Sequence, residues 1–282
     1  MSEYSDILYS VTDGVATITL NRPDKLNAWT AAMQGSVKHA LMDAARDAAV
    51  RVITITGAGR GFCAGADMGA LQKIDSVKWN ERALAHDGPP ADLASLPKIG
   101  PTVSAHYGGR FGYLMSIPKP IIAAINGPCA GIGLVFTLYC DLRFAAHDAK
   151  FTTAFAQRGL IAEHGISWLL PRLCGMANAL DVLLSARKFT AADALRIGMV
   201  NAVYQQESFN KDVTAYARQL ADAVSPRSMA VMKAQLWKAL YQDLNEAVAT
   251  ADVEMQKSFA TEDFKEGVAH FVEKRAPRFT GK

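Results

Sequence analysis

The stretch Pro120–Asp141, PIIAAINGPCAGIGLVFTLYCD, predicts a strand, a tight loop and a buried helix in immediate succession. The β-branched run at residues 121–125 is typical of a core strand, and Asn126-Gly127-Pro128 ends it. Gly131 and Gly133 allow another backbone segment to come close just before the apolar helical pattern Leu134–Cys140. Because N–H groups at the start of a helix lack partners within the helix, this loop can hold negative charge.

A second loop rich in glycine follows another predicted strand. The strand Val50–Thr56 leads directly into residues 57–67, GAGRGFCAGAD. Two such loops could present N–H groups to one oxygen atom, which indicates an oxyanion hole, although either loop alone also fits an ordinary tight turn. The segment does not match a GxGxxG loop that opens a helix, and the chain has no P-loop GK[ST] and no GxSxG. A nucleotide site and a serine hydrolase are therefore disfavoured.

Strands and helices alternate up to about residue 205, and only helical patterns follow. This order predicts an α/β core over residues 1–205, which contains the site, and a helical region over residues 206–282. The segment 71–116 has mixed periodicity and is interpreted as an irregular, partly helical insertion near the site. The other predicted strands are Ile7–Val11, Val15–Leu20, Leu142–Ala146, Phe151–Phe155 and Met199–Val203, and the other helices are a Thr30-capped helix ending near Ala49, Ala177–Leu184, one capped by Thr190, one beginning at Ser225-Pro226, Ala247–Phe259 and Thr261–Arg275.

Composition excludes several classes of function. The 282 residues include 30 basic and 27 acidic side chains, a formal charge of only +3, and no basic cluster interleaved with aromatic residues, so neither a nucleic acid nor a membrane is expected as a partner. The start MSEYSDILYS lacks an apolar signal core, and a cytoplasmic protein is expected. The four cysteines lack metal-site spacing, which predicts buried, reduced thiols and no metal.

Several motifs, in order, resemble the crotonase (enoyl-CoA hydratase/isomerase) superfamily. Outside residues 71–118 they cover nearly the whole chain and keep the spacing of that family. The motifs are residues 21–28 (NRPDKLNA), 61–67 (GFCAGAD), 118–141 (the PKP…AING…AGIG…CD pattern) and 271–275 (FVEKR).

The resemblance implies a spiral of ββα units and a C-terminal helical trimerisation region. It also implies an acyl-CoA thioester as substrate with no separate cofactor, and a homotrimer or dimer of trimers. The N–H groups of Ala66 and Ile132 would hold the thioester oxygen, where an enolate develops negative charge. Ile132 stands where the family commonly has glycine, which keeps the N–H but adds bulk near the acyl chain.

The two positions that carry glutamates in hydratases of the family hold Val135 and Phe155 here. Neither side chain can accept a proton or orient water, so hydration by the two-glutamate route is disfavoured. Glu163 resembles the single acid/base glutamate of certain enoyl-CoA isomerases, since one carboxylate can move a proton between the α- and γ-carbons. A capping carboxylate at a helix start is the alternative role for Glu163, and His164 could either tune it or face solvent.

Further residues are expected to bind substrate. Phe271 and Lys274 resemble a C-terminal pair that reaches CoA across a subunit interface, although a solvated lysine on an amphipathic helix fits equally. Asp67 could contact ligand or cap the following helix, and Arg22 lies near Lys25, where a basic residue could meet the CoA diphosphate. The residues assigned to substrate binding are Lys25, Ala64, Asp67, Met68, Val135, Phe155, Phe271 and Lys274, and residues of the insertion that could line the acyl pocket or form an exposed lid are His106, Tyr107, Arg110, Phe111 and Tyr113.

Three functions therefore stay open from the sequence. The first is an isomerase in which Glu163 moves the proton and Ala66 and Ile132 hold the enolate. The second is a hydratase with an atypical water site, and the third is an acyl-CoA-binding protein without catalysis.

Overall fold

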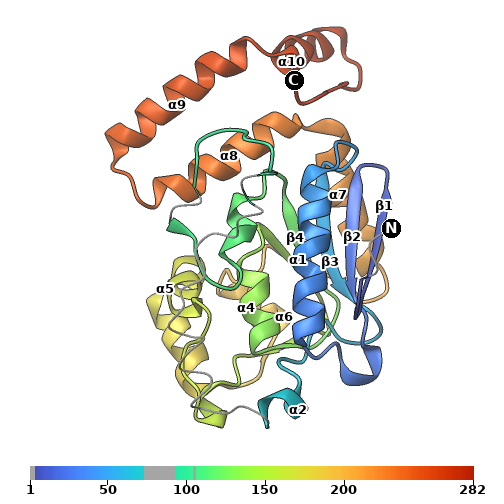
Figure 1. The fold of residues 1–282 in the computed structure, drawn as a ribbon, viewed down its shortest axis with the longest axis vertical. Coiled ribbons are helices and arrows are strands. Elements are labelled where there is room, and N and C mark those ends of the chain that lie inside the picture. Colours follow the sequence, from blue (N-terminus) through green and yellow to red (C-terminus); the bar gives the residue numbers. More distant parts are fainter. Residues whose placement is uncertain (1–3, 73–92, 94, 104–105) are drawn as a thin grey trace.

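The computed structural model describes residues 4–72, 93, 95–103 and 106–282. A six-stranded sheet in the order β1-β2-β3-β4-β6-β9 forms its centre, with β1 antiparallel to β2 and every other pair parallel (Figure 1). Apolar side chains fill both faces of the middle strands, as expected for a sheet covered on both sides. The strands are β1 (Ile7–Thr12), β2 (Val15–Leu20), β3 (Val52–Gly57), β4 (Ile121–Ile125), β6 (Leu142–Ala146) and β9 (Ala202–Tyr204).

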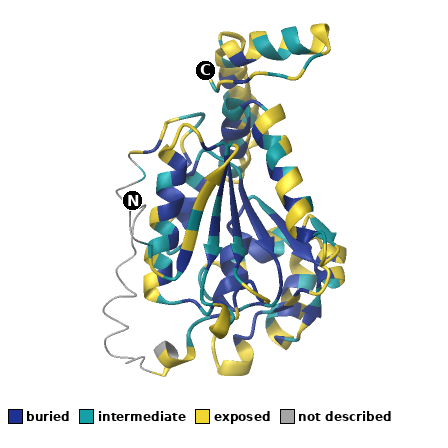
Figure 2. Cartoon of the chain, turned by 90° about the vertical axis from the view of Figure 1, so that its right-hand side faces the viewer, coloured by how far each residue is buried: buried dark blue, intermediate teal, exposed yellow. Residues whose placement is uncertain are grey.

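Helices cover the two faces of this sheet. Helix α1 (Ala31–Arg46) packs on one face, where Met33 and Val37 join a large core with Ile18 and Ile55. Helix α7 (Phe209–Ala223) packs on the other face against β2, β3, β4 and β6. Figure 2 shows the inner strands of the sheet as a buried layer, whereas the edge strand β1 is largely exposed.

A small second sheet lies beside the site. Its strands are β5 (Cys129–Ala130), β7 (Lys150–Thr152) and β8 (Phe189–Thr190), in that order. Isolated parallel bridges extend the same layer, since Trp29 pairs with Ala66 and Cys63 pairs with Cys129. The two glycine loops are thereby joined through backbone pairing.

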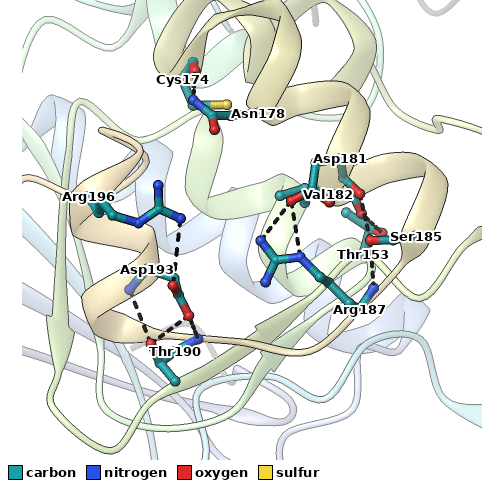
Figure 3. A network of polar contacts seen from close by, with 10 residues as sticks. All are labelled: Thr153, Cys174, Asn178, Asp181, Val182, Ser185, Arg187, Thr190, Asp193 and Arg196. Atoms are coloured by element: carbon teal, nitrogen blue, oxygen red, sulfur yellow. Dashed lines mark hydrogen bonds and ion pairs between the residues drawn. The ribbon is translucent and has the colours of Figure 1, made fainter.

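Polar contacts fix helix α5 (Ile166–Ser185) and helix α6 (Ala191–Arg196) relative to the small sheet (Figure 3). The Thr153 hydroxyl donates to the Val182 carbonyl at 3.1 Å, and Arg187 donates to the Asp181 carboxylate at 2.7 Å. Thr190 is the predicted cap of α6, and it forms a capping box with Asp193, because each side chain accepts the other's backbone N–H. Thr153 stands two residues before Phe155, so this network holds the backbone that leads to Phe155.

The C-terminal helices extend away from the core. Helix α8 (Pro226–Ala239) crosses the upper end of the core, and α9 (Leu244–Phe259) and α10 (Glu262–Glu273) lie beyond it, at the end of the molecule opposite to the short helix α2 (Met68–Leu71) (Figure 1). A buried Lys233 ammonium anchors α8 by donating to the Asp141 carboxylate at 2.7 Å and to the Leu114 carbonyl at 3.0 Å. None of the helices within the described ranges is long and apolar enough to cross a membrane.

The predicted α/β class is confirmed. The first two predicted strands pair as a hairpin, and the helices predicted to begin at Thr30, Ser225 and Thr261 have these residues as their N-caps. The boundary near residue 205 and the oligomeric role of the helical region stay predictions.

Several element bounds were wrong. The Thr30-capped helix ends at Arg46 rather than near Ala49, and the helix predicted at Leu134–Cys140 is α4, which spans Ile132–Leu138. The helix predicted at Ala177–Leu184 is the end of α5, which begins at Ile166 and contains a kink at Gly175, where φ is +76°. The strand bounds differ as well, most clearly at β9, which starts three residues after Met199 because only residues 202–204 pair with β6.

Candidate active site

Two asparagines hold the first glycine loop in shape. The buried Asn27 side chain donates to the carbonyls of Ala58 at 3.0 Å and Gly61 at 2.8 Å. Asn126 donates to the carbonyls of Gly57 and Gly59, and its own oxygen accepts from the Gly57 N–H at 3.1 Å. The end of β4 therefore fixes the loop that follows β3.

The N–H groups of Ala66 and Ile132 are available to a ligand. Trp29 bonds to the residues on either side of Ala66, because its N–H donates to the Gly65 carbonyl and its carbonyl accepts from Asp67. In a parallel pairing of this kind the N–H of the middle residue points away from the partner. No carbonyl in the described ranges accepts from Ala66 or Ile132, and Val135 makes the first bond inside α4 by donating to Gly131.

The two donors lie on loops in close contact. A Cβ atom built on Gly131 would lie 3.7 Å from the Gly65 Cα, and one built on Gly65 would lie 3.5 Å from the Ala130 carbonyl oxygen. Ala66 and Ile132 each come one residue after one of these glycines. The structure thus brings both loops to one place, as an oxyanion hole requires.

The two positions that the resemblance assigns to the hydratase glutamates carry buried apolar side chains. Val135 is fully buried within α4, and Phe155 is 6% exposed at the start of the segment that leads to Glu163. The Gly131 N–H donates to the Thr152 carbonyl at 3.1 Å, which ties this segment to the second glycine loop. Neither side chain offers an acceptor for a proton.

Glu163 lies on a segment that the end of α4 holds in place. The Tyr139 hydroxyl, one residue past α4, donates to the His164 carbonyl at 2.7 Å, and the Glu163 carbonyl accepts the Ile166 N–H that opens α5. The Glu163 side chain is 31% exposed. Burial raises the pKa of its carboxyl, and the Arg110 guanidinium opposes part of that rise. A carboxylate with a raised pKa is a stronger base.

His164 and Arg110 complete a group of three titratable side chains. Burial, with the positive charge of Arg110 as the second cause, lowers the pKa of His164 from 6.5 to about 4. The 3.8 Å contact between His164 Nε2 and the Glu163 carboxylate is therefore not an ion pair at neutral pH. Burial also lowers the pKa of Arg110, and the charge of Glu163 opposes this shift.

Aromatic rings line the interior beside these groups. The Phe111 ring is almost completely buried, with its centroid 6.3 Å from the ring of His164 and 5.7 Å from that of Tyr139. It also packs edge-on against Trp29, the residue that flanks Ala66, at 5.7 Å. This cluster connects the Glu163 segment to the first glycine loop.

A second aromatic group joins the insertion, α5 and α8. The Tyr107 hydroxyl donates to the Trp237 carbonyl at 2.6 Å, and its ring packs edge-on against Trp168. Trp168 stacks with Trp237 and with Tyr241, and the Arg172 guanidinium lies 3.9 Å from the centre of its ring. The first residues of α5, just after Glu163, are thereby fixed to the end of α8.

Comparison with known proteins decides the family. The profile of the enoyl-CoA hydratase/isomerase family matches residues 10–86 and 102–282. The chain belongs to the crotonase superfamily. It is 35% identical over 276 residues to the 1,2-epoxyphenylacetyl-CoA isomerase of Escherichia coli K12, with 98% of each chain covered. A Rhodobacter capsulatus relative named "Probable enoyl-CoA hydratase" is also 35% identical, with 99% of each chain covered.

Solved structures give the same result. A Geobacillus kaustophilus chain described as enoyl-CoA hydratase subunit I superposes with a TM-score of 0.84 at 31% identity, and all of both chains is covered. The crotonase fold is therefore confirmed for this chain, and it is an acyl-CoA-processing enzyme of that family. Crotonase enzymes act on CoA thioesters without a required cofactor, and the described residues contain no group of side chains suited to a metal ion.

The predicted substrate-binding residues near the first loop of this crotonase lie together. The Leu26 carbonyl, next to Lys25, accepts the Ala64 N–H at 2.9 Å, and Lys25, Ala64 and Met68 are all exposed. Asp67 pairs with Arg22 at 3.0 Å and accepts the Gly69 N–H at 3.0 Å. These contacts support the alternative in which Asp67 caps the following helix. The ion pair with Asp67 gives Arg22 a structural role in holding the loop.

Phe271 and Lys274 lie away from this group. Phe271 is 80% exposed on α10, and Lys274 ends that helix, at the opposite end of the molecule from α2 (Figure 1). Within one chain they do not come together with Ala66 and Ile132, and their contact with CoA across a subunit interface stays a prediction.

The burial of the aromatic residues in the insertion bears on whether they line a pocket or form an exposed lid. Tyr107, Phe111 and Tyr113 are buried, so the exposed-lid alternative is wrong for these three rings, whereas His106 is exposed and stacks on Tyr241. The proximity of Arg110 to Glu163 was not predicted, since nothing in the periodicity of residues 71–116 relates it to a position 53 residues later. The hydrogen bond from the Tyr139 hydroxyl to the His164 carbonyl was not predicted either, although Tyr139 lies near the end of the helix predicted within residues 120–141.

Proposed function

We propose that this crotonase is an enoyl-CoA isomerase that moves a carbon–carbon double bond along the acyl chain. The observation that carries the proposal is a single part-buried carboxylate, Glu163, with a raised pKa, together with apolar side chains at positions 135 and 155. Moving a proton requires one such group. Adding water by the two-glutamate route requires two.

The proposed reaction has two proton transfers. Glu163 removes a proton from the α-carbon of a 3-enoyl-CoA, and the electron pair forms a dienolate with its negative charge on the thioester oxygen. The N–H groups of Ala66 and Ile132 donate hydrogen bonds to that oxygen, and each such donor typically accounts for about 10²–10³ in turnover. Glu163 then returns the proton to the γ-carbon, which gives the conjugated 2-enoyl-CoA.

Replacement of Glu163 tests the proposal. Glu163→Gln keeps the shape and removes the base, so the rate of conversion of a 3-enoyl-CoA, followed by the absorbance of the conjugated thioester, is expected to fall by about 10²–10⁴. Glu207→Gln is the matched control, because Glu207 is an exposed carboxylate in the loop before α7. Unchanged turnover in Glu163→Gln contradicts the proposal.

The two other functions give different results in the same assay. A hydratase would remove the absorbance of a 2-enoyl-CoA, and one relative carries a hydratase name. A binding protein without catalysis would bind CoA thioesters in calorimetry and convert neither substrate. Conversion of the 3-enoyl-CoA that depends on Glu163 excludes that third function.

A further inference from the structure

Gly175, in the middle of α5, has a backbone conformation that only glycine adopts readily. Its φ is +76° and its ψ is 159°, whereas the residues around it are helical. A Cβ atom built on Gly175 would meet nothing within 4 Å, so the backbone conformation, and not a lack of space, requires glycine here. Unusual backbone conformations are concentrated at functional sites, which makes the purpose of this bend a specific question.

The bend belongs to the folded structure and is not a frayed helix end. The Cys174 carbonyl, directly before the bend, accepts a hydrogen bond from the Asn178 side-chain amide at 2.8 Å (Figure 3). In a continuous helix this carbonyl would accept from the backbone N–H of residue 178. The Asn178 side chain thus satisfies a carbonyl next to the break in the helix.

The second half of α5, residues 176–185, is fixed to the small sheet that carries one oxyanion donor. The Ala186 carbonyl, directly after α5, accepts from the Thr152 hydroxyl at 2.8 Å. Thr152 lies in β7, and its carbonyl accepts the Gly131 N–H at 3.1 Å, one residue before Ile132. The second half of α5 and the Ile132 donor are therefore held by the same strand.

The first half of α5, residues 166–174, is fixed to other elements and carries Glu163. The Glu163 carbonyl accepts the Ile166 N–H at 3.1 Å, so the candidate base is hydrogen-bonded to the first residue of the helix. Trp168 stacks on Trp237 of α8, which belongs to the C-terminal helices. The two halves of α5 thus connect the candidate base with one of the donors that would hold the thioester oxygen, and Gly175 is the joint between them.

We propose that Gly175 is a positioning residue, whose bend sets the place of the Glu163 carboxylate relative to the oxyanion donors. The first half of α5 is about 14 Å long, so a change of about 10° in the bend would move its start by about 2 Å. This inference rests on the proposed function, because it takes Glu163 as the group that moves the proton. Gly175 itself contacts none of the reacting atoms and acts through the helix.

Gly175→Ala tests the inference by changing the bend. Its methyl group has room, so the effect comes from the backbone conformation that alanine disfavours. The turnover number with a 3-enoyl-CoA is expected to fall by about 10²-fold, because a misplacement of about 1 Å can cost that much. Binding of hexanoyl-CoA in calorimetry is expected to stay within about threefold, since the two glycine loops keep their own hydrogen bonds.

Gly14→Ala is the matched control for a substitution at positive φ. Gly14 also has a φ of +76°, in the turn between β1 and β2, and a Cβ atom there would make an ordinary contact of 3.5 Å with Ala221. This variant is expected to melt at a lower temperature, with an unchanged turnover number below its unfolding transition. The acid limb of the turnover number against pH reports protonation of the base, so it is expected to shift in Gly175→Ala and to stay in place in Gly14→Ala.

Trp237→Leu tests the same placement at the other end of the first half of α5, even if Gly175→Ala does not fold. Loss of the stack with Trp168 is expected to lower the turnover number by about 10-fold while hexanoyl-CoA binding stays the same. The inference is overturned if Gly175→Ala or Trp237→Leu turns over like the wild type, or if Gly14→Ala loses as much turnover as Gly175→Ala. A wild-type protein without turnover refutes the isomerase proposal and this inference together, whereas wild-type turnover that Gly175→Ala preserves refutes the inference alone.

Discussion

At the scale of single residues, the chemistry of this site depends on how burial acts on three neighbouring side chains. Burial favours the neutral form of each group, but it has a different consequence for each. It makes the Glu163 carboxylate a stronger base, keeps His164 uncharged at neutral pH and makes the charge of Arg110 costly. The site therefore holds one strengthened base, Glu163, beside an imidazole that is uncharged at neutral pH.

The lowered pKa of His164 predicts a pH dependence of stability. The unfolded chain binds a proton at His164 below about pH 6.5, whereas the folded chain binds it only below about pH 4. The free energy of unfolding is therefore expected to fall by at most about 3 kcal/mol as the pH drops through this window. Denaturant titrations between pH 4 and 7 measure this change.

His164→Asn is the matched variant for that measurement. Asparagine does not titrate, and it tolerates the positive φ of +53° at this position. The difference in stability between wild type and variant should vary across the window, while the opposite contribution of Glu163 and the charge of Arg110 are common to both proteins. A difference that stays constant from pH 4 to 7 would show that His164 titrates normally.

At the scale of elements, the helix starts marked by a capping residue were predicted correctly, whereas the start of α5, which has no side-chain cap, was not. Thr190 with Asp193, and Ser225 with Pro226, act on backbone groups within four residues, so the sequence contains all the information needed for them. The strand β9 depends on pairing with β6, some 58 residues earlier, and its bounds could not be predicted from its own residues. The same limit applies to the site, where Phe111 and His164 meet through tertiary packing alone.

The contact between α4 and the first glycine loop gives a prediction for one element. A Cβ atom on Gly133 would lie 2.6 Å from the Cys63 Cβ and 2.9 Å from the Cys63 carbonyl oxygen. Gly133→Ala should therefore displace the start of α4, together with the Ile132 N–H, and lower the turnover number by about 10²–10³, as for loss of an oxyanion donor. Steady-state kinetics on a 3-enoyl-CoA measures this loss.

Gly35→Ala serves as the control substitution. Gly35 lies within α1, and a Cβ atom there would meet nothing within 4 Å. This variant is expected to be more stable by about 0.5–1 kcal/mol, because alanine favours the helix over glycine, with kinetics unchanged. Normal turnover by Gly133→Ala would mean that α4 can shift without cost to the site.

At the scale of the whole molecule, the C-terminal helices expose an unusual amount of apolar surface. Soluble monomers rarely expose large continuous apolar patches, so this surface is typical of a protein–protein interface. The expected homotrimer or dimer of trimers would cover it and would bring Phe271 and Lys274 of one chain towards another. The exposed apolar residues of α8 to α10 are Met232, Leu236, Leu244, Val248, Val253, Met255, Phe259, Phe264, Val268, Phe271 and Val272.

A charge placed on this surface tests the expected assembly. Leu236 is 72% exposed on α8, and Leu236→Glu should shift the molar mass in light scattering towards that of a single chain, because a buried unpaired carboxylate destabilises an interface. Leu8→Glu on the edge strand β1, where Leu8 is 55% exposed, should leave the mass unchanged. A wild-type protein that elutes as a single chain at micromolar concentration would contradict the expectation.

The stacked indoles of Trp168 and Trp237 also make the intrinsic fluorescence of the protein sensitive to movements of its helices. Their ring centres lie 6.5 Å apart at an interplanar angle of 29°, one on the first turns of α5 and the other near the end of α8. Rings this close exchange excitation energy, so their emission changes with very small displacements of one helix against the other. The intrinsic fluorescence of the protein therefore records, without any added label, how the C-terminal helices move relative to the segment that carries Glu163.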